Sequence, residues 1–396
     1  MKNMGLIPKL IVGIIVGVIV GLTMPDNLGR VLYTFTQIFG QLLGYIVPLI
    51  IIGFIIPGIA ELGEKAGKLL GGTAAIAYVS TVAAGIAAFL ISSLVIPAIV
   101  TQGVVASEST GIQPILALDI PPIMGVMTAL ITAFIFGLGI NFLRHQEAKQ
   151  VLFNFMEEFR TIIVLFIKKV IIPLLPIYIS GIFANMAAEG DAFATLQVFA
   201  QVFALIIVMH IGYLVAIYLV AGVRAGVNPL VALKNMLPAY ATALGTMSSA
   251  ATIPVTLRSA KSNKVSERIA DFVIPLSATI HLAGSTITLV ACSIAVLAMN
   301  GLNPNFGEYL PFIMLLGVTM VAAPGVPGGA VMAALGLLST ILGFSEAQIG
   351  LMIGLYMAQD SFGTACNVTG DGAIALIVDS FYKKEATEAT EATEAA

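Results

Sequence analysis

The stretch from Gln359 to Asp371, which reads QDSFGTACNVTGD, places two carboxylates inside otherwise apolar sequence. On an α-helix that turns about 100° per residue, Thr364 and Asn367 share one face with both carboxylates, Asp360 and Asp371. An ionisable side chain in the middle of a membrane costs at least about 2.5 kcal/mol unless it meets a cation, a partner or water. These four residues form a polar stripe along the helix. Because no basic residue shares this face, the stripe predicts a site for a cation and a polar solute. The alternative is a hydrogen-bond network that packs helices together.

The composition excludes a soluble globular protein. Of the 396 residues, 59% are hydrophobic and 10% are charged, whereas about 25% are charged in a typical soluble domain. Cys292 and Cys366 lie in apolar segments, which favours packing roles over a disulfide framework. The chain has no Walker sequence, dinucleotide fingerprint, Cys/His metal spacing or nucleophile elbow. We therefore expect a protein of the lipid bilayer that is neither an enzyme nor an ATP-driven pump, with no nucleic-acid partner.

The hydropathy pattern predicts an all-α polytopic membrane protein with eight transmembrane helices and two re-entrant helical hairpins. The first apolar run, Leu6 to Met24, is expected to remain as a helix because no small-residue cleavage site follows it. The predicted spans are 6–24, 31–60, 70–100, 121–144, 152–188, 194–223, 267–299 and 346–380, and the hairpins are 228–260 and 309–343.

The two hairpin segments are broken by residues that do not suit a lipid-facing helix. Ala243 to Pro254 reads ALGTMSSAATIP, and Val321 to Val331 reads VAAPGVPGGAV. Irregular backbone at membrane depth is tolerated only where protein buries it or where it lines a cavity. Both tips are therefore predicted to lie in the protein interior, although small-residue patches also pack helices and Pro-Gly runs also form ordinary loops.

The seventh span is interrupted between Ser277 and Ser285, in the sequence SATIHLAGS. Unwound backbone there would offer carbonyl oxygens to a cation. His281 could equally be a buried histidine that is bonded to a neighbour, and His210 is interpreted as structural. Two hairpins and one broken helix near a carboxylate stripe are typical of a secondary transporter with a midplane site; a channel is the alternative.

The basic residues predict the orientation of the chain. Of the 18 Lys and Arg residues, three (Arg160, Lys168 and Lys169) lie deep inside a predicted span, and one, Arg30, lies beside a span end on one side. The other 14 share the opposite side, which predicts cytoplasmic termini in a plasma or inner membrane. They are Lys2, Lys9, Lys65, Lys68, Arg144, Lys149, Arg224, Lys234, Arg258, Lys261, Lys264, Arg268, Lys383 and Lys384. The C-terminal EATEATEATEAA is expected to be a disordered acidic tail.

Four motifs in order resemble the dicarboxylate/amino acid:cation symporters, which include the glutamate transporters. They are TMSSAATIPVT from Thr246, PLSATIHLAGS from Pro275, GVPGGAVM from Gly325 and DSFGTACNVTGD from Asp360. The resemblance implies the glutamate-transporter fold with inverted repeats, a homotrimer and elevator-type alternating access. It also implies a scaffold of helices 1–2 (1–67) and 4–5 (101–190), and a transport part formed by helix 3 (68–100) and residues 191–380, followed by the tail (381–396).

The same resemblance implies roles for individual residues. Asp360 would bind the α-ammonium of the substrate, Asn367 its α-carboxylate, and Asp371 a sodium ion. The implied substrate-binding set is Ser248, Ser249, Ser285, Gly325, Val326, Pro327, Asp360, Gly363, Thr364 and Asn367. The implied cation set, for Na⁺ as the coupling ion, is Ser277, Thr279, His281, Asn367 and Asp371.

Departures from the family pattern predict the substrate class. Members that carry dicarboxylates have an arginine at the positions of Gly363 or Met247 here. The broken helix usually reads NMDGT, so His281 replaces an Asn and Ala283 replaces the Asp of a third sodium site. That alanine and the sequence QDS (Gln359–Ser361) at the start of the stripe are similar to the serine/threonine branch. We expect a sodium-coupled symporter of small neutral amino acids; the alternatives are a proton-coupled or dicarboxylate symporter, and a channel or non-transporting receptor.

Overall fold

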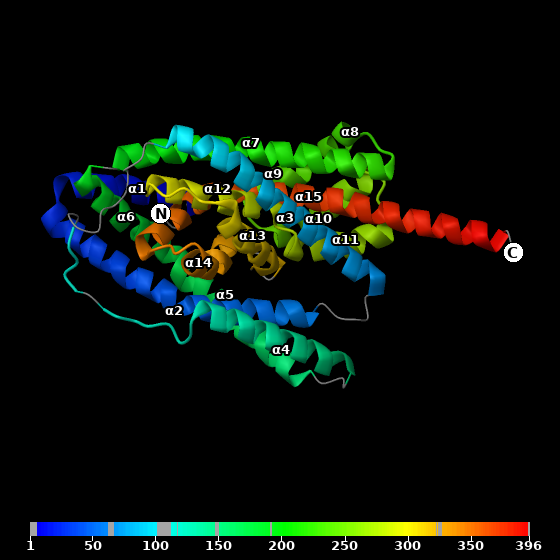
Figure 1. The fold of residues 1–396 in the computed structure, drawn as a ribbon, viewed down its shortest axis with the longest axis horizontal. Helices are drawn as coiled ribbons and strands as arrows, with labels where there is room; N and C mark the ends of the chain where they lie inside the picture. Colours follow the sequence, from blue (N-terminus) through cyan, green and yellow to red (C-terminus); the bar gives the residue numbers. More distant parts are fainter. Residues whose placement is uncertain are drawn as a thin grey trace.

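The computed structural model consists of helices, with no strand in the part of the chain that it describes (Figure 1). The described residues are 6–61, 67–100, 112–116, 118–146, 150–190, 192–321, 323 and 327–394. Most of the long helices run along the long axis of the molecule (Figure 1). The all-α polytopic fold expected from the sequence is confirmed.

The N-terminal half contains α1 (Leu6–Thr23), η1 (Pro25–Gly29), α2 (Arg30–Glu61), α3 (Gly67–Ile99), α4 (Val126–Gln146), α5 (Val151–Phe166), η3 (Ile167–Ile171) and α6 (Ile172–Glu189). The C-terminal half contains α7 (Ala192–Ala225), α8 (Pro229–Asn235), α9 (Leu237–Thr246), α10 (Ser249–Ser262), α11 (Glu267–Ile280), α12 (Ala283–Met299), α13 (Phe306–Val321), α14 (Gly329–Ile341) and α15 (Glu346–Glu394).

Five described segments are long and apolar enough to cross a membrane by length and composition. They are Pro25–Ala60, Leu69–Ile99, Val151–Glu189, Ala192–Ala225 and Glu267–Met299, and they match five of the predicted spans. The predicted first and fourth spans correspond to α1 and α4, whose apolar parts, Pro8–Thr23 and Ile131–Arg144, are shorter.

Both predicted hairpins are pairs of helices. The first joins α9 to α10 through Met247, which adopts a left-handed conformation (φ 52°), and the Ser248 side chain caps α10 by accepting from the Ala251 amide at 3.3 Å. The second pairs α13 with α14, and α14 is preceded by Gly328 at φ 74°. Glycine reaches such a φ without a Cβ penalty, which explains its place at this turn.

The predicted interruption of the seventh span is also confirmed. α11 ends at Ile280 and α12 begins at Ala283, with His281 in an extended conformation between them. α15 packs against α7, α9, α10, α11 and α12, so that the hairpin, the broken helix and the carboxylate stripe meet around one helix.

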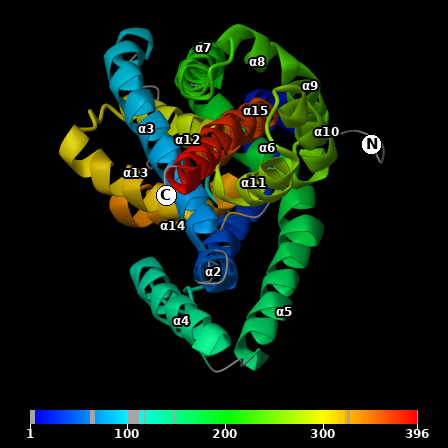
Figure 2. The same ribbon diagram turned by 90° about the vertical axis from the view of Figure 1, so that its right-hand side faces the viewer.

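A second group of helices packs around α2 and α6. α2 contacts α4, α5 and α6, and α6 contacts α1; Figure 2 shows α4 and α5 extending away from the helices that surround α15. Gly13, Gly17 and Gly21 face α6 so closely that an added Cβ would overlap the carbonyl oxygens of Pro176, Ser180 and Ala184. Glycines at this spacing allow helix backbones to touch. The division into a scaffold and a transport part stays a prediction.

The C-terminal tail differs from the sequence expectation of disorder. α15 continues to Glu394 and projects beyond the other helices (Figure 1). Ala and Glu are strong helix formers, and extending an existing helix requires no new nucleus. The acidic repeat therefore prolongs α15.

Candidate substrate and cation site

The four residues of the polar stripe lie on α15 and are buried. Asp360, Thr364, Asn367 and Asp371 expose between 1% and 6% of their surface. α15 is continuous through the stripe, so the four side chains share one face as the spacing predicts. Two carboxylates are therefore held in the interior of the protein.

His281, at the break between α11 and α12, binds Asp371. Its Nδ1 atom lies 2.9 Å from Oδ1 of Asp371, and its Nε2 atom lies 3.0 Å from the Tyr213 hydroxyl. The Tyr213 hydroxyl is also 2.8 Å from Oγ of Ser80. A carboxylate only accepts, so Nδ1 carries the proton towards Asp371, and Nε2 accepts from Tyr213. A neutral imidazole satisfies both contacts.

The second carboxylate oxygen of Asp371 has no hydrogen-bond partner. Oδ2 of Asp371 is buried without one, as are the hydroxyl oxygens of Ser277 and Thr369. An unsatisfied buried carboxylate oxygen is costly, and hard oxygens are the ligands that Na⁺ prefers. Among the described residues no group of three or more His, Cys, Asp or Glu side chains forms a metal cluster. A cation here would therefore use one carboxylate together with hydroxyl and carbonyl oxygens.

Asn367 on α15 forms hydrogen bonds with the broken helix. Its Oδ1 atom accepts from the amides of Gly284 (2.8 Å) and Ser285 (3.2 Å), and its Nδ2 atom donates to Oγ of Ser285 (2.9 Å). These amides belong to the first turn of α12, where backbone N–H groups lack helical partners. The structure thus brings Asn367 and Ser285 together, and one N–H of the Asn367 amide remains for a ligand.

Asp360 contacts the second hairpin. Its Oδ2 atom accepts from the backbone amide of Gly328 at 2.7 Å. The Tyr356 hydroxyl is buried beside Asp360 and Ser285. Of the predicted tip, Pro327 is half-buried next to this contact, whereas Gly325 and Val326 lie outside the described residues.

The two serines of the first hairpin lie at the beginning of α10. Ser248 is the cap of α10, and Ser249 is buried in the first turn of that helix. The hydroxyls of Thr246 and Thr252 lie 3.0 Å apart and close the turn. α9 and α10 both pack on α15, which places this hairpin beside the stripe.

The structure does not bring the Thr279 side chain into the site. Thr279 is exposed, and its hydroxyl donates to the carbonyl of Leu276 at 2.8 Å. Ser277, in contrast, is fully buried and its carbonyl accepts from the His281 amide at 2.8 Å. Gly363 and Met247 occupy the two positions where an arginine would be expected in a dicarboxylate carrier. A Cβ on Gly363 would lie 3.6 Å from the Ser285 backbone, and Met247 forms the turn of the first hairpin.

Sequence reasoning missed two residues that orient His281. Tyr213 and Ser80 contact His281 from α7 and α3. His210, interpreted as structural, lies with Nε2 2.9 Å from the Gly284 carbonyl, at the break. The sequence did contain one signal for Tyr213: a tyrosine within an apolar segment needs a hydrogen-bond partner for its hydroxyl when it is buried.

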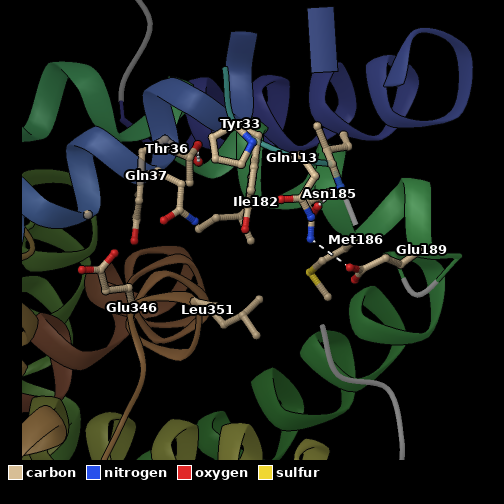
Figure 3. Close-up of a pocket in the computed structure, with 15 residues that line it drawn as sticks. Tyr33, Thr36, Gln37, Gln113, Ile182, Asn185, Met186, Glu189, Glu346 and Leu351 are labelled. Atoms are coloured by element: carbon tan, nitrogen blue, oxygen red, sulfur yellow. Dashed lines mark hydrogen bonds between the residues drawn. The ribbon is translucent and has the colours of Figure 1, made fainter. Parts of the chain in front are cut away.

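A separate polar cavity of about 370 Å³ lies between α2, α6 and the start of α15 (Figure 3). Glu346 and Glu189 line it at two places, and the Asn185 amide donates to Glu189 at 3.2 Å. No residue of the stripe lines this cavity. It therefore lies between the α2–α6 group and the first turns of α15.

Comparison with known proteins agrees with this geometry. The sodium:dicarboxylate symporter family matches residues 6–381. An excitatory amino acid transporter of Caenorhabditis elegans is 30% identical over 173 residues, which cover 43% of this chain and 34% of that protein. Excitatory amino acid transporter 1 of Ambystoma tigrinum is 32% identical over 159 residues (40% and 29%), and excitatory amino acid transporter 3 of Mus musculus is 33% identical over 159 residues (40% and 30%).

The matched segment spans about a third of the length of these relatives. The family match, in contrast, extends from α1 to the part of α15 beyond the stripe. It confirms the resemblance carried by the two hairpins, the broken helix and the stripe. The chain belongs to the sodium:dicarboxylate symporter family, a family of membrane transporters and not of enzymes.

Proposed function

We propose that the protein is a sodium-coupled symporter of small neutral amino acids, with serine and threonine as the best substrates. The observation that supports this most is the lack of a basic partner for Asp360. Within the described residues its polar neighbours are the Gly328 amide and the Tyr356 hydroxyl, and no ion pair includes it. Asp360 is therefore suited to the α-ammonium group of an amino acid.

The substrate carboxylate has partners in the same region. Asn367 retains one amide N–H, α9 and α10 of the first hairpin pack on α15, and the Gly328 amide before α14 contacts Asp360. A second carboxylate on the substrate side chain would have no described cation to pair with, because Gly363 stands where the family's dicarboxylate carriers have an arginine. Burying an unpaired charge costs several kcal/mol, which favours a neutral side chain.

The coupling ion is proposed to be Na⁺ at Asp371. The unpartnered Oδ2 of Asp371 and the unpartnered hydroxyl of Ser277 are hard oxygen ligands in the interior. His281 binds the other oxygen of the same carboxylate, which leaves proton coupling as the alternative to be tested.

The proposed mechanism is an elevator-type movement of the helices around α15 past those around α2 and α6, in a homotrimer of the plasma or inner membrane with cytoplasmic termini. The polar cavity between the two groups supports a boundary at this place. The 14 basic residues on one side support the orientation.

Uptake into proteoliposomes tests the proposal. Labelled serine should accumulate above its external concentration when an inward sodium gradient is imposed, and unlabelled threonine should compete. Accumulation that follows a proton gradient and ignores sodium would contradict sodium coupling. Equilibration without accumulation under any gradient would indicate a channel, and the absence of uptake with retained serine binding would indicate a receptor.

A further inference from the structure

An apolar groove of about 980 Å³ lies between α3 and α7, two helices that flank α12 in Figure 2. Small residues, among them Ala83, Ala84 and Gly212, form its walls, and Ile287 and Ile374 contribute from α12 and α15. The groove therefore reaches from the surface of the helix bundle towards its interior.

The groove is about as long as the hydrocarbon core of a bilayer is thick. On α7 it extends from Leu205 to Arg224, and 19 residues at about 1.5 Å per residue span about 28 Å. The hydrocarbon core of a bilayer is about 30 Å thick. Apart from Ser80, Tyr213 and Arg224 its lining is apolar, and an apolar cavity without polar partners does not hold ordered water. Hydrocarbon is the material that fills such a groove at membrane depth.

One end of the groove carries a positive charge. The Arg224 guanidinium lies 4.3 Å from the centre of the Phe381 ring, and both residues line the groove. Arg224 forms no ion pair or hydrogen bond with a residue that the structure describes. The basic-residue count assigns this end to the cytoplasmic side, where anionic headgroups attract basic side chains.

Ser80 and Tyr213, which hold His281, also line this groove. We propose that an anionic phospholipid binds here, with one acyl chain between α3 and α7 and its phosphate on Arg224. The acyl chain covers Ser80 and Tyr213 and keeps water from the His281–Asp371 pair. The site is thus a lipid site next to the proposed cation site.

Native mass spectrometry of the full chain tests the headgroup. The purified protein is exposed to phosphatidylglycerol or to phosphatidylcholine of the same chain length, and retained lipid is measured. The wild type should retain phosphatidylglycerol preferentially. Arg224→Gln should reduce that preference about fivefold, the effect of one basic residue at a lipid surface. Arg258→Gln is the matched control, because Arg258 is exposed on the same predicted side and does not line the groove.

A second pair of variants tests the chain position. Gly212→Leu should lower retention of both lipids, because a Cβ at Gly212 enters open space in the groove. Gly139→Leu on α4, where a side chain also meets open space, should leave retention unchanged.

Three outcomes would overturn the proposal. One is equal retention of the two lipids by the wild type, and another is equal loss in Arg224→Gln and Arg258→Gln. The third is cross-linking from Gly212→Cys to the same position of a second copy of the chain, which would show that protein and not lipid covers the groove.

Discussion

Nδ1 of His281 lies 2.9 Å from Oδ1 of Asp371, and Oδ2 of the same carboxylate has no partner. One oxygen is thus held by the broken helix while the other stays available. Tyr213 fixes the far side of the imidazole ring, so the ring cannot rotate freely away from the carboxylate. This arrangement leaves a single oriented oxygen for the proposed cation.

Asp371→Asn should lower the apparent affinity for sodium by tenfold or more, about 1.4 kcal/mol, because the amide carries no charge to balance the ion. Sodium-dependent serine uptake and size-exclusion chromatography measure the effect and the assembly. The oligomer should remain intact, since Asp371 contacts no helix of the α2–α6 group in any described hydrogen bond. Unchanged sodium dependence in Asp371→Asn would contradict the proposal that Asp371 binds sodium.

His281→Asn should leave the pH profile of transport similar to that of the wild type. A neutral imidazole already satisfies Asp371 and Tyr213, so no proton needs to be gained or lost during transport. Uptake is compared from about pH 5.5 to about pH 8.5, the range in which an ordinary histidine changes charge. Tyr213→Phe, which removes one contact to His281, is the companion variant.

A pH dependence that is present in the wild type and lost in His281→Asn would instead favour proton coupling. A sodium affinity that falls equally in Tyr213→Phe and His281→Asn would support the role of Tyr213 in orienting the ring.

The hairpins and the broken helix could be predicted because their signals are local. Pro327 with its neighbouring glycines and the hydroxyl cluster at Ser248 are visible within a few residues of sequence, and helix-breaking residues act where they stand. The stripe on α15 was predictable for the same reason, since helical spacing alone places Asp360 and Asp371 on one face.

The contacts of His281 could not be predicted from the sequence, because they join distant helices. Ser80 is on α3 and Tyr213 is on α7, 201 and 68 residues away from His281. Only the packing of these helices brings the two hydroxyls to one imidazole. The helical end of α15 was missed for a different reason: a low-complexity acidic composition suggests disorder, while Ala and Glu favour helix once a helix is already formed.

In the double variant Gly40→Cys/Glu346→Cys, a disulfide between the two cysteines should prevent transport. A Cβ built on Gly40 lies 3.9 Å from Cβ of Glu346, within the range of about 3.5–4.5 Å that a disulfide requires. The two positions belong to α2 and α15, the groups proposed to move past each other. Oxidation should stop uptake, and reductant should restore it.

Each single cysteine variant is the control for this experiment, and the native Cys292 and Cys366 are buried. Mass spectrometry of the oxidised protein shows whether the bond has formed. Full uptake by protein that carries the disulfide would contradict the proposed movement of α15 relative to α2.

Gly363→Arg should weaken serine uptake and create measurable competition by aspartate. In the wild type, aspartate should compete poorly, because a loss of several kcal/mol moves a micromolar ligand beyond about millimolar. A Cβ at Gly363 would lie 3.6 Å from the Ser285 backbone and from Oγ1 of Thr288, an ordinary contact distance. The first atom of a new side chain therefore fits, and the chain can extend from α15 towards the break in the seventh span.

Gly363→Lys is the matched control, because it adds the positive charge without the planar guanidinium group of arginine. Arginine binds a carboxylate through two parallel hydrogen bonds, whereas lysine offers a point charge, so the lysine variant should admit aspartate less well. Competition is measured with labelled serine at equal concentrations of aspartate, and Gly363→Leu reports the effect of bulk alone. If aspartate already matches serine in the wild type, the charge argument is wrong and a basic group outside the described contacts of Asp360 must reach the substrate.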